Sequence, residues 1–159
     1  MRDSYKTLSE KAAAEISEIM PWDLQARLGS EPDLMVLDVR ERTEYEAAHI
    51  KGAINVPRGI LEAACEWDYA ETEPELVTAR QRSIVVVCRS GNRSALAALV
   101  MKAIGFENVA SMKLGIKGWN DGDLPLVDCR GRSVDPDDAA HLIEPKLAPE
   151  QIDPARRKP

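Results

Sequence analysis

Residues 84–94 read Ile84-Val85-Val86-Val87-Cys88-Arg89-Ser90-Gly91-Asn92-Arg93-Ser94, an apolar run followed by a cysteine and six polar or flexible residues. The four β-branched residues predict a strand that is buried on both faces. The polar residues after Cys88 predict a tight loop, and a helix is expected from about Arg93-Ser94 to Ile104. This strand–loop–helix unit determines the fold class and the position of the chemistry.

Further strands and helices alternate around this unit. Strands are expected at 34–39, 53–56 and 109–110, and helical segments at 7–20, 21–28, 43–48, 60–65 and 116–120. Strands that alternate with helices predict an α/β fold with a central parallel sheet flanked by helices on both faces. The expected organisation is a helical extension over 1–14, the α/β domain over 15–127, and a proline-rich tail over 128–159 with at most one short helix, around 137–143.

Length and charge limit the classes of function. A chain of 159 residues corresponds to one domain. Its net charge of −6 argues against a general binder of nucleic acid or of anionic membranes. No apolar run approaches the roughly 18 residues that a membrane-spanning helix needs. The expected partners therefore include neither nucleic acid nor membrane.

The cysteines and histidines indicate a reducing setting and no metal. Cys65, Cys88 and Cys129 are odd in number, so they cannot all be paired in disulfides. We therefore expect free thiols and a cytoplasmic location. His49 and His141 are the only histidines and complete no zinc-binding spacing. No metal and no cofactor are predicted.

The loop after Cys88 carries the chemistry. Ligands of open parallel sheets bind beyond the carboxyl ends of the strands, where the sequence places Cys88. Backbone N–H groups of the turn, the helix N-terminus and the charges of Arg89 and Arg93 would favour the thiolate of Cys88 and bind an oxyanion. The alternative is that Cys88 is only a small apolar residue at a strand end. The polar run that follows it favours the first interpretation.

The sequence resembles the single-domain rhodanese, or thiosulfate sulfurtransferase, family over about residues 15–127. Five segments in the family's order carry the resemblance: 88–94, 37–41 (Leu-Asp-Val-Arg-Glu), 49–57 (His-Ile-Lys-Gly-Ala-Ile-Asn-Val-Pro), 105–109 and 114–119. Leu114 departs from the pattern, because it stands where the family often has the first of two glycines. The tail after Val127 has no counterpart in a minimal domain of this family.

The resemblance implies that Cys88 accepts a sulfane sulfur from thiosulfate or a similar donor. The resulting Cys88 persulfide would pass this sulfur to cyanide or to a thiol, in a two-stage covalent mechanism. The substrate-binding residues would be those of the loop, namely Arg89, Ser90, Gly91, Asn92 and Arg93, with Arg93 more than Arg89 neutralising the dianionic donor. Four residues would support the site, namely Asp38, Arg40, Ser94 and Arg58. Asp38 and Arg40 are interpreted as an ion pair that holds loops.

Two other functions remain open. The first is a sulfur-trafficking or regulatory binding module whose persulfide acts only with a specific protein partner. The second, a phosphatase or arsenate reductase, ranks lower because the Cys88-x4-Arg93 loop is one residue shorter than the Cys-x5-Arg loop of the phosphatases on this fold.

The expected partners are a small anionic sulfur donor and a thiol or cyanide acceptor. A protein acceptor and a homodimer are both compatible with the sequence.

Overall fold

The computed structural model describes residues 1–157 and is built around a five-stranded sheet in which every neighbouring pair is parallel. The strand order is β1-β5-β4-β2-β3. The strands are β1 (Ser17–Ile19), β2 (Met35–Asp38), β3 (Ile54–Asn55), β4 (Ser83–Val87) and β5 (Asn108–Met112). The α/β class and the central parallel sheet expected from the sequence are confirmed.

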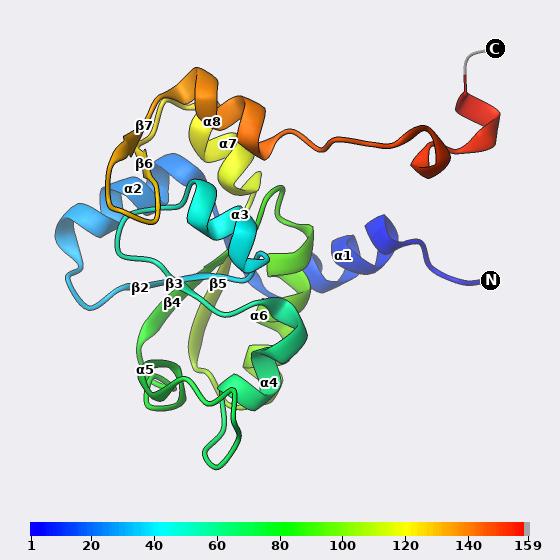
Figure 1. Ribbon diagram of the computed structural model, residues 1–159. Coiled ribbons are helices and arrows are strands. Elements are labelled where there is room, and N and C mark those ends of the chain that lie inside the picture. The colour runs from blue at the N-terminus through cyan, green and yellow to red at the C-terminus, as the bar shows by residue number, and fades with distance from the viewer. Residues whose placement is uncertain (158–159) are drawn as a thin grey trace.

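Helices cover both faces of the sheet (Figure 1). One face carries α2 (Pro21–Ser30), α3 (Arg42–Ala47), α7 (Gly115–Asp121) and α8 (Pro136–Ile143). The other carries α4 (Leu61–Ala64), α5 (Pro74–Val77) and α6 (Asn92–Ala103), and α1 (Tyr5–Ala14) packs against α6. The remaining elements are short: η1 (Arg58–Ile60), the antiparallel pair β6 (Leu126–Val127) and β7 (Ser133–Val134), η2 (Pro149–Gln151) and η3 (Pro154–Arg156).

The core is aliphatic and lies on both sides of β4. Ile84 and Val86 pack into the cluster under α6, whereas Val85 and Val87 pack into the cluster under α2, α7 and α8. Successive side chains of a strand point to opposite faces, so a continuous apolar run suits a central strand that is buried twice. The expectation of a doubly buried strand is confirmed.

The edges of the fold differ from expectation. The helix expected over 7–20 ends at Ala14, and residues 17–19 form β1, whose partner is β5. The helix α2 continues past Gly29 to Ser30. The short helix expected in the tail is α8, which is N-capped by the Asp135 carboxylate. Among the described residues, no helix has both the length and the apolar character needed to cross a membrane.

The first part of the C-terminal segment, through α8, packs against the α/β domain, and the remainder extends away from it. The β6–β7 pair is linked to the domain through Val127, whose backbone pairs with that of His49 at 2.9 Å in both directions. Next, α8 packs against α7 and contacts α3. After α8 the chain runs away from the domain towards the C-terminal end (Figure 1). Residues 136–145 therefore lie against the α/β domain, and the chain after them does not.

Candidate active site

Cys88 directly follows β4, which lies between β5 and β2 in the middle of the sheet. The loop of residues 89–91 then leads into α6, with Gly91 as the N-cap residue. Gly91 has a φ of 97°, a left-handed conformation that only glycine adopts without strain. This turn folds the chain back over the end of β4 and brings the start of α6 beside Cys88.

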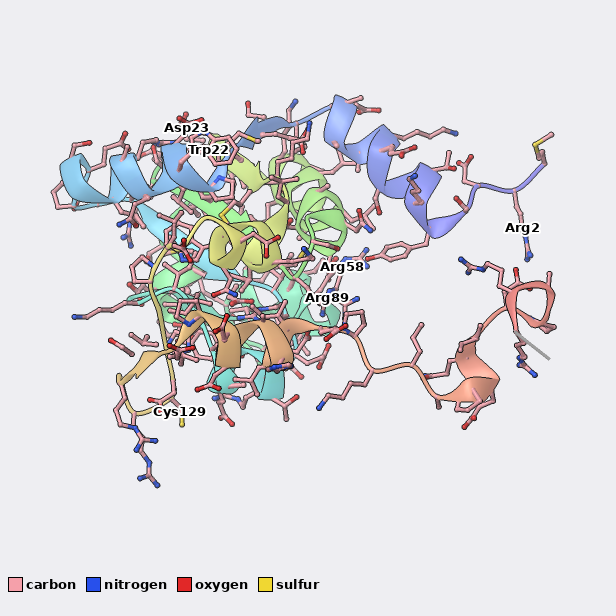
Figure 2. All side chains as sticks on the ribbon, turned by 90° about the horizontal axis from the view of Figure 1, so that it is seen from above. Arg2, Trp22, Asp23, Arg58, Arg89 and Cys129 are labelled. Atoms are coloured by element: carbon pink, nitrogen blue, oxygen red, sulfur yellow. The ribbon has the colours of Figure 1, made fainter. Side chains whose placement is uncertain are left out.

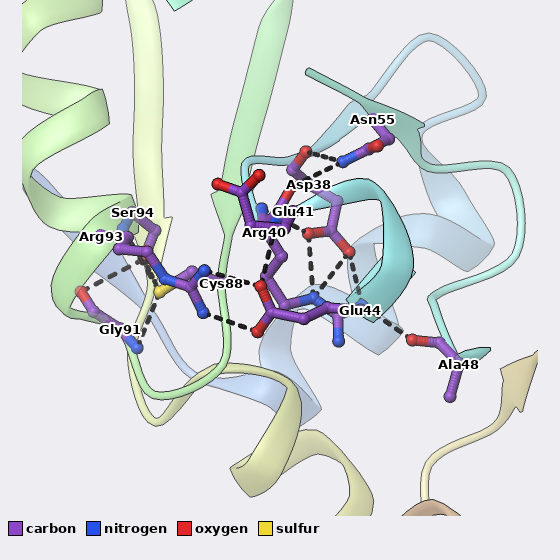
Figure 3. Close-up of polar contacts among 10 residues, drawn as sticks. All are labelled: Asp38, Arg40, Glu41, Glu44, Ala48, Asn55, Cys88, Gly91, Arg93 and Ser94. Atoms are coloured by element: carbon purple, nitrogen blue, oxygen red, sulfur yellow. Dashed lines mark hydrogen bonds and ion pairs between the residues drawn. The ribbon is translucent and has the colours of Figure 1, made fainter. Parts of the chain in front are cut away.

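The Cys88 sulfur lies inside this turn (Figure 3). Its Sγ accepts hydrogen bonds from the N–H of Gly91 at 3.1 Å and from the N–H of Ser94 at 3.3 Å. The residue is only 1% exposed, and its apolar neighbours belong to the cluster under α6. Backbone N–H groups at a helix start carry partial positive charge, so they stabilise negative charge on the sulfur.

Two buried hydroxyl groups extend this network. The Cys88 thiol donates to Ser94 Oγ at 3.4 Å, and Ser94 Oγ donates to the Gly91 carbonyl at 3.2 Å. Ser111, on β5, donates to Ser94 Oγ at 2.8 Å, and both serines are fully buried. Ser94 was expected from the sequence, but Ser111 was not, because it lies just after residues 109–110, for which a strand was expected.

Arg93 is bound to an acidic side chain rather than left free (Figure 3). Its Nη1 and Nη2 donate to the Glu44 carboxylate at 2.8 and 2.9 Å. Hydrogen bonding to Glu44 raises the pKa of Arg93. Burial raises the pKa of Glu44, but hydrogen bonds from Arg93 and from the Glu41 N–H outweigh it, so the net pKa is lowered. The expected donor-neutralising arginine is therefore already neutralised by Glu44, a residue the sequence analysis did not name.

Asp38 and Arg40 form a buried ion pair beside the loop. Arg40 Nη2 donates to Asp38 Oδ2 at 2.8 Å and to the Ala48 carbonyl at 2.7 Å. The Asn55 amide donates to the carbonyls of Asp38 and Arg40 at 3.0 and 2.9 Å. These contacts join the ends of β2 and β3 to the segment after α3. The geometry fits the interpretation of this pair as a structural one.

Two arginines near the loop are not engaged in ion pairs. Arg89 is half-buried in the loop, and Arg58 is exposed in η1; neither has an acidic partner within 4 Å in the part of the chain that the structure describes. The Arg58 N–H bonds to the Val39 carbonyl, and the Val39 N–H bonds to the Val87 carbonyl. Both arginines therefore lie at the carboxyl edge of the sheet, and both are labelled in Figure 2.

The segment that starts α7 holds the loop from the opposite side. The N–H groups of Ile116 and Lys117 donate to the carbonyls of Cys88 and Arg89 at 2.8 and 3.0 Å. Gly115 has a φ of 64°, and a Cβ at this position would overlap the Arg89 carbonyl. Leu114 also adopts positive φ, at 68°. Position 115 thus requires glycine, because the Arg89 backbone approaches it too closely for a Cβ. Leu114 adopts a positive φ, which is strained for a residue with a side chain.

The remaining candidate residues lie outside this network. His49 Nδ1 bonds to the Tyr45 carbonyl at 2.7 Å, and within residues 1–157 no group of three potential metal ligands converges. Cys65 is fully buried, and burial raises the pKa of its thiol to about 11. Cys129 is exposed at the tip of the β6–β7 turn (Figure 2). Neither of these thiols has the donors that surround Cys88.

Comparison with family models gives a match to the rhodanese-like domain over residues 20–122. The match contains β2 to β5, the Cys88 loop and α7, and it leaves out α1 and α8. A Bacillus subtilis relative, YrkF, is described as a candidate sulfur carrier protein and is 34% identical over 111 residues. These residues are 70% of this chain but 55% of the relative, so the chain spans about half of that protein's length.

Solved structures of similar fold include two that bear on function. A Pseudomonas aeruginosa thiosulfate sulfurtransferase superposes with a TM-score of 0.65 and 25% identity, covering 80% of this chain and 23% of that one. A Rhodopseudomonas palustris protein of unknown function, described as a candidate tyrosine phosphatase, superposes with a TM-score of 0.71 and 26% identity. It covers 79% of this chain and 96% of that one.

Proposed function

The chain belongs to the rhodanese-like domain family, and on that basis we propose that it transfers sulfane sulfur through a persulfide on Cys88. The proposed donor is thiosulfate or another small anionic donor, and the proposed acceptor is cyanide or a thiol. One observation carries the proposal: a cysteine sulfur at the end of the central strand accepts hydrogen bonds from two backbone N–H groups, one in its loop and one in the first turn of α6. This environment supports both a nucleophilic sulfur and the charge that moves onto it.

In the first half-reaction the Cys88 thiolate attacks the outer sulfur of the donor. With thiosulfate, a bond forms between Sγ and the sulfane sulfur while the bond to the sulfonate sulfur breaks. Its electron pair leaves with sulfite, and the enzyme keeps a negatively charged persulfide. In the second half-reaction the acceptor attacks the outer sulfur, and the electron pair of the broken S–S bond returns to Sγ. Because one product leaves before the acceptor reacts, ping-pong kinetics are expected.

The arginines divide between two tasks. Arg89 and Arg58 have no acidic partner in the described chain, so they are available for the anionic end of the donor. Arg93, paired with Glu44, acts as a positioning residue that ties the first turn of α6 to α3. This division differs from the sequence-based expectation, in which Arg93 was the main anion-binding group.

Two alternative functions share the same loop. In a carrier module, the Cys88 persulfide would react only with a protein partner, and the description of the Bacillus subtilis relative as a candidate sulfur carrier keeps this version open. Hydrolysis of a phosphate monoester, suggested by the description of the Rhodopseudomonas palustris protein, is disfavoured. The reason is that the Arg93 guanidinium, which would clamp the phosphate, is occupied by Glu44.

The test is the intact mass of the protein after thiosulfate treatment, before and after cyanide, together with turnover of thiosulfate and cyanide. Wild type should gain one sulfur atom, mapped to Cys88, and lose it to cyanide. Cys88→Ser should lose both the mass gain and turnover, whereas the control Cys129→Ser should keep both. Turnover that survives in Cys88→Ser would overturn the mechanism. A stable mass gain without turnover would favour the carrier version, and hydrolysis of p-nitrophenyl phosphate would favour the phosphatase.

A further inference from the structure

Ser111 lies on β5, beside the strand that leads to Cys88, and it is fully buried. Val109, two residues earlier on β5, packs into the cluster under α6. Alternate residues of a strand point to the same face, so Ser111 also faces α6, which carries Ser94. The Ser111 hydroxyl donates to Ser94 Oγ at 2.8 Å. Burial of a hydroxyl costs free energy unless a hydrogen bond replaces water, and Ser94 supplies that bond.

The Ser94 hydroxyl uses its full hydrogen-bonding capacity while Cys88 is a thiol. A serine hydroxyl has one hydrogen to donate and two lone pairs that accept. The lone pairs of Ser94 Oγ accept from Ser111 at 2.8 Å and from the Cys88 thiol at 3.4 Å. Its hydrogen is donated to the Gly91 carbonyl at 3.2 Å. The thiol form therefore leaves no hydrogen-bonding group of Ser94 Oγ unused.

Ionisation of Cys88 reverses one of these hydrogen bonds. Once the thiol has given its proton to solvent, a lone pair of Ser94 Oγ would face a negatively charged sulfur at 3.4 Å. Rotation of the Ser94 O–H from the Gly91 carbonyl towards Sγ replaces this repulsion with a hydrogen bond. The Gly91 carbonyl tolerates the change, because it also accepts from the Ala95 N–H at 3.2 Å. The O–H of Ser94 then joins the N–H groups of Gly91 and Ser94 as donors to the thiolate.

We propose that Ser111 is a positioning residue for sulfur transfer, which holds the Ser94 oxygen beside Cys88 and directs its hydrogen to the thiolate. Ser111 keeps its bond to Ser94 in both states, because it occupies only one lone pair. A hydroxyl that accepts a hydrogen bond is also polarised into a better donor. In the second half-reaction the Cys88 thiolate is the leaving group, so the same donor stabilises it as it forms. This inference rests on the proposed function and adds to it a residue that acts through Ser94.

The test is the pH profile of the Cys88 thiolate and of its reaction with thiosulfate. Ultraviolet absorbance of the thiolate, with the signal of Cys88→Ser subtracted, reports ionisation independently of sulfur transfer. Sulfite released in a single turnover reports the first half-reaction. Ser111→Ala should move the midpoint of both profiles up by about one pH unit, as the loss of support for a charged hydrogen bond predicts. Sulfite release should then be about tenfold slower below the midpoint and unchanged well above it, whereas a structural defect would slow it equally at every pH.

Further substitutions separate the hydroxyl from the shape of the side chain. Ser111→Thr keeps the hydroxyl and should resemble wild type, whereas Ser111→Val has the same shape without the hydroxyl and should shift as Ser111→Ala does. Adding Ser111→Ala to Ser94→Ala should cause no further shift, because Ser111 acts through Ser94. The control Ser9→Ala removes another buried hydroxyl, which donates to the Tyr5 carbonyl at 2.9 Å, and should leave both profiles unchanged.

None of these substitutions changes a charge near the sulfur. The charged groups of the surrounding elements are the same in every variant, namely Arg58, Arg89, Lys113 and the pairs Arg93–Glu44, Asp38–Arg40 and Lys117–Asp121. The inference is overturned if Ser111→Ala and Ser111→Val keep the wild-type midpoint, or if the double variant shifts beyond Ser94→Ala. Sulfur transfer with an unshifted midpoint leaves the proposed function intact. A shifted midpoint in a protein that takes up no sulfur overturns the proposed function and leaves only the effect of Ser111 on the thiolate.

Discussion

A Glu44→Gln substitution removes the carboxylate that Arg93 binds through two contacts of 2.8 and 2.9 Å. The Arg93 and Glu44 side chains are 23% and 29% exposed, so the pair is neither on the surface nor fully buried. Exposed pairs contribute about 0.2–1 kcal/mol, and breaking a buried pair costs about 3–5 kcal/mol. We therefore expect Glu44→Gln to lower the free energy of unfolding by about 1–2 kcal/mol.

The same substitution should improve the use of a dianionic donor. The Glu44 carboxylate neutralises Arg93 and adds a negative charge near the loop. Without it, the Arg93 guanidinium can turn towards thiosulfate, and one source of repulsion is gone. A partly screened charge contact is worth about 1 kcal/mol, so KM for thiosulfate should fall about fivefold. Steady-state turnover with cyanide in excess measures this effect.

The pH dependence of stability follows from the lowered pKa of Glu44. A carboxyl whose pKa is lower in the folded state than its ordinary 4.5 stabilises the fold above that value. This contribution is lost as the pH falls through the lower folded value. Wild type should therefore be more stable than Glu44→Gln by a constant amount from about pH 5 to 8, and the difference should shrink below about pH 4.

The matched control is Glu46→Gln on the same helix. Glu46 pairs with Arg42 at 3.6 Å, and these side chains are 46% and 69% exposed. This substitution should change stability by less than about 0.5 kcal/mol and leave KM unchanged. A rise in KM for thiosulfate in Glu44→Gln would refute the reasoning, because it would mean that the pair is needed to shape the donor site.

Two further substitutions test the packing of the loop and the second buried thiol. Gly115→Ala should lower the free energy of unfolding by at least about 2 kcal/mol and reduce turnover, because the new Cβ would overlap the Arg89 carbonyl at a φ of 64°. The control Gly59→Ala, whose Cβ would lie in open space, should change neither the free energy of unfolding nor turnover. Thermal unfolding measures the effect on stability. Burial raises the pKa of Cys65 to about 11, because the folded protein favours the neutral thiol. This preference contributes fully to the free energy of unfolding below about pH 9, and the contribution is lost as the pH rises to about 11. Denaturant titrations of Cys65→Ala should show no such loss of stability at high pH. Iodoacetamide at pH 8 should label the exposed Cys129 well before the buried Cys65. Faster labelling of Cys65 would contradict the argument from burial.

The parts of the fold that follow from local pattern were predictable. The β-branched run before Cys88 and the polar turn after it are local signals, and β4 and α6 form there. The strand β1 was missed because Ser17 and Glu18 are exposed and the segment has only three residues. It becomes a strand by pairing with β5, which is a tertiary effect that no local pattern encodes.

The site was predictable to the level of its loop but not of its partners. The position of Cys88 at a strand end, followed by a glycine-bearing turn, is visible in the order of residues alone. Glu44 lies 49 residues before Arg93, and Ser111 lies 17 residues after Ser94, so neither contact follows from spacing. The charge of Arg93 was therefore expected to be free, although the fold assigns it to α3.

The burial of Cys88 affects how the protein withstands oxidants. Because the Cys88 thiol is 1% exposed and Cys129 is exposed, we expect hydrogen peroxide to oxidise Cys88 to sulfinic or sulfonic acid more slowly than Cys129 in the resting protein. In the proposed persulfide the added sulfur would lie about 2 Å from Sγ, which is the length of an S–S bond. Under peroxide stress the outer sulfur of the proposed persulfide would be the atom at greatest risk, and a thiol reductant that cleaves the S–S bond would then return the cysteine itself undamaged.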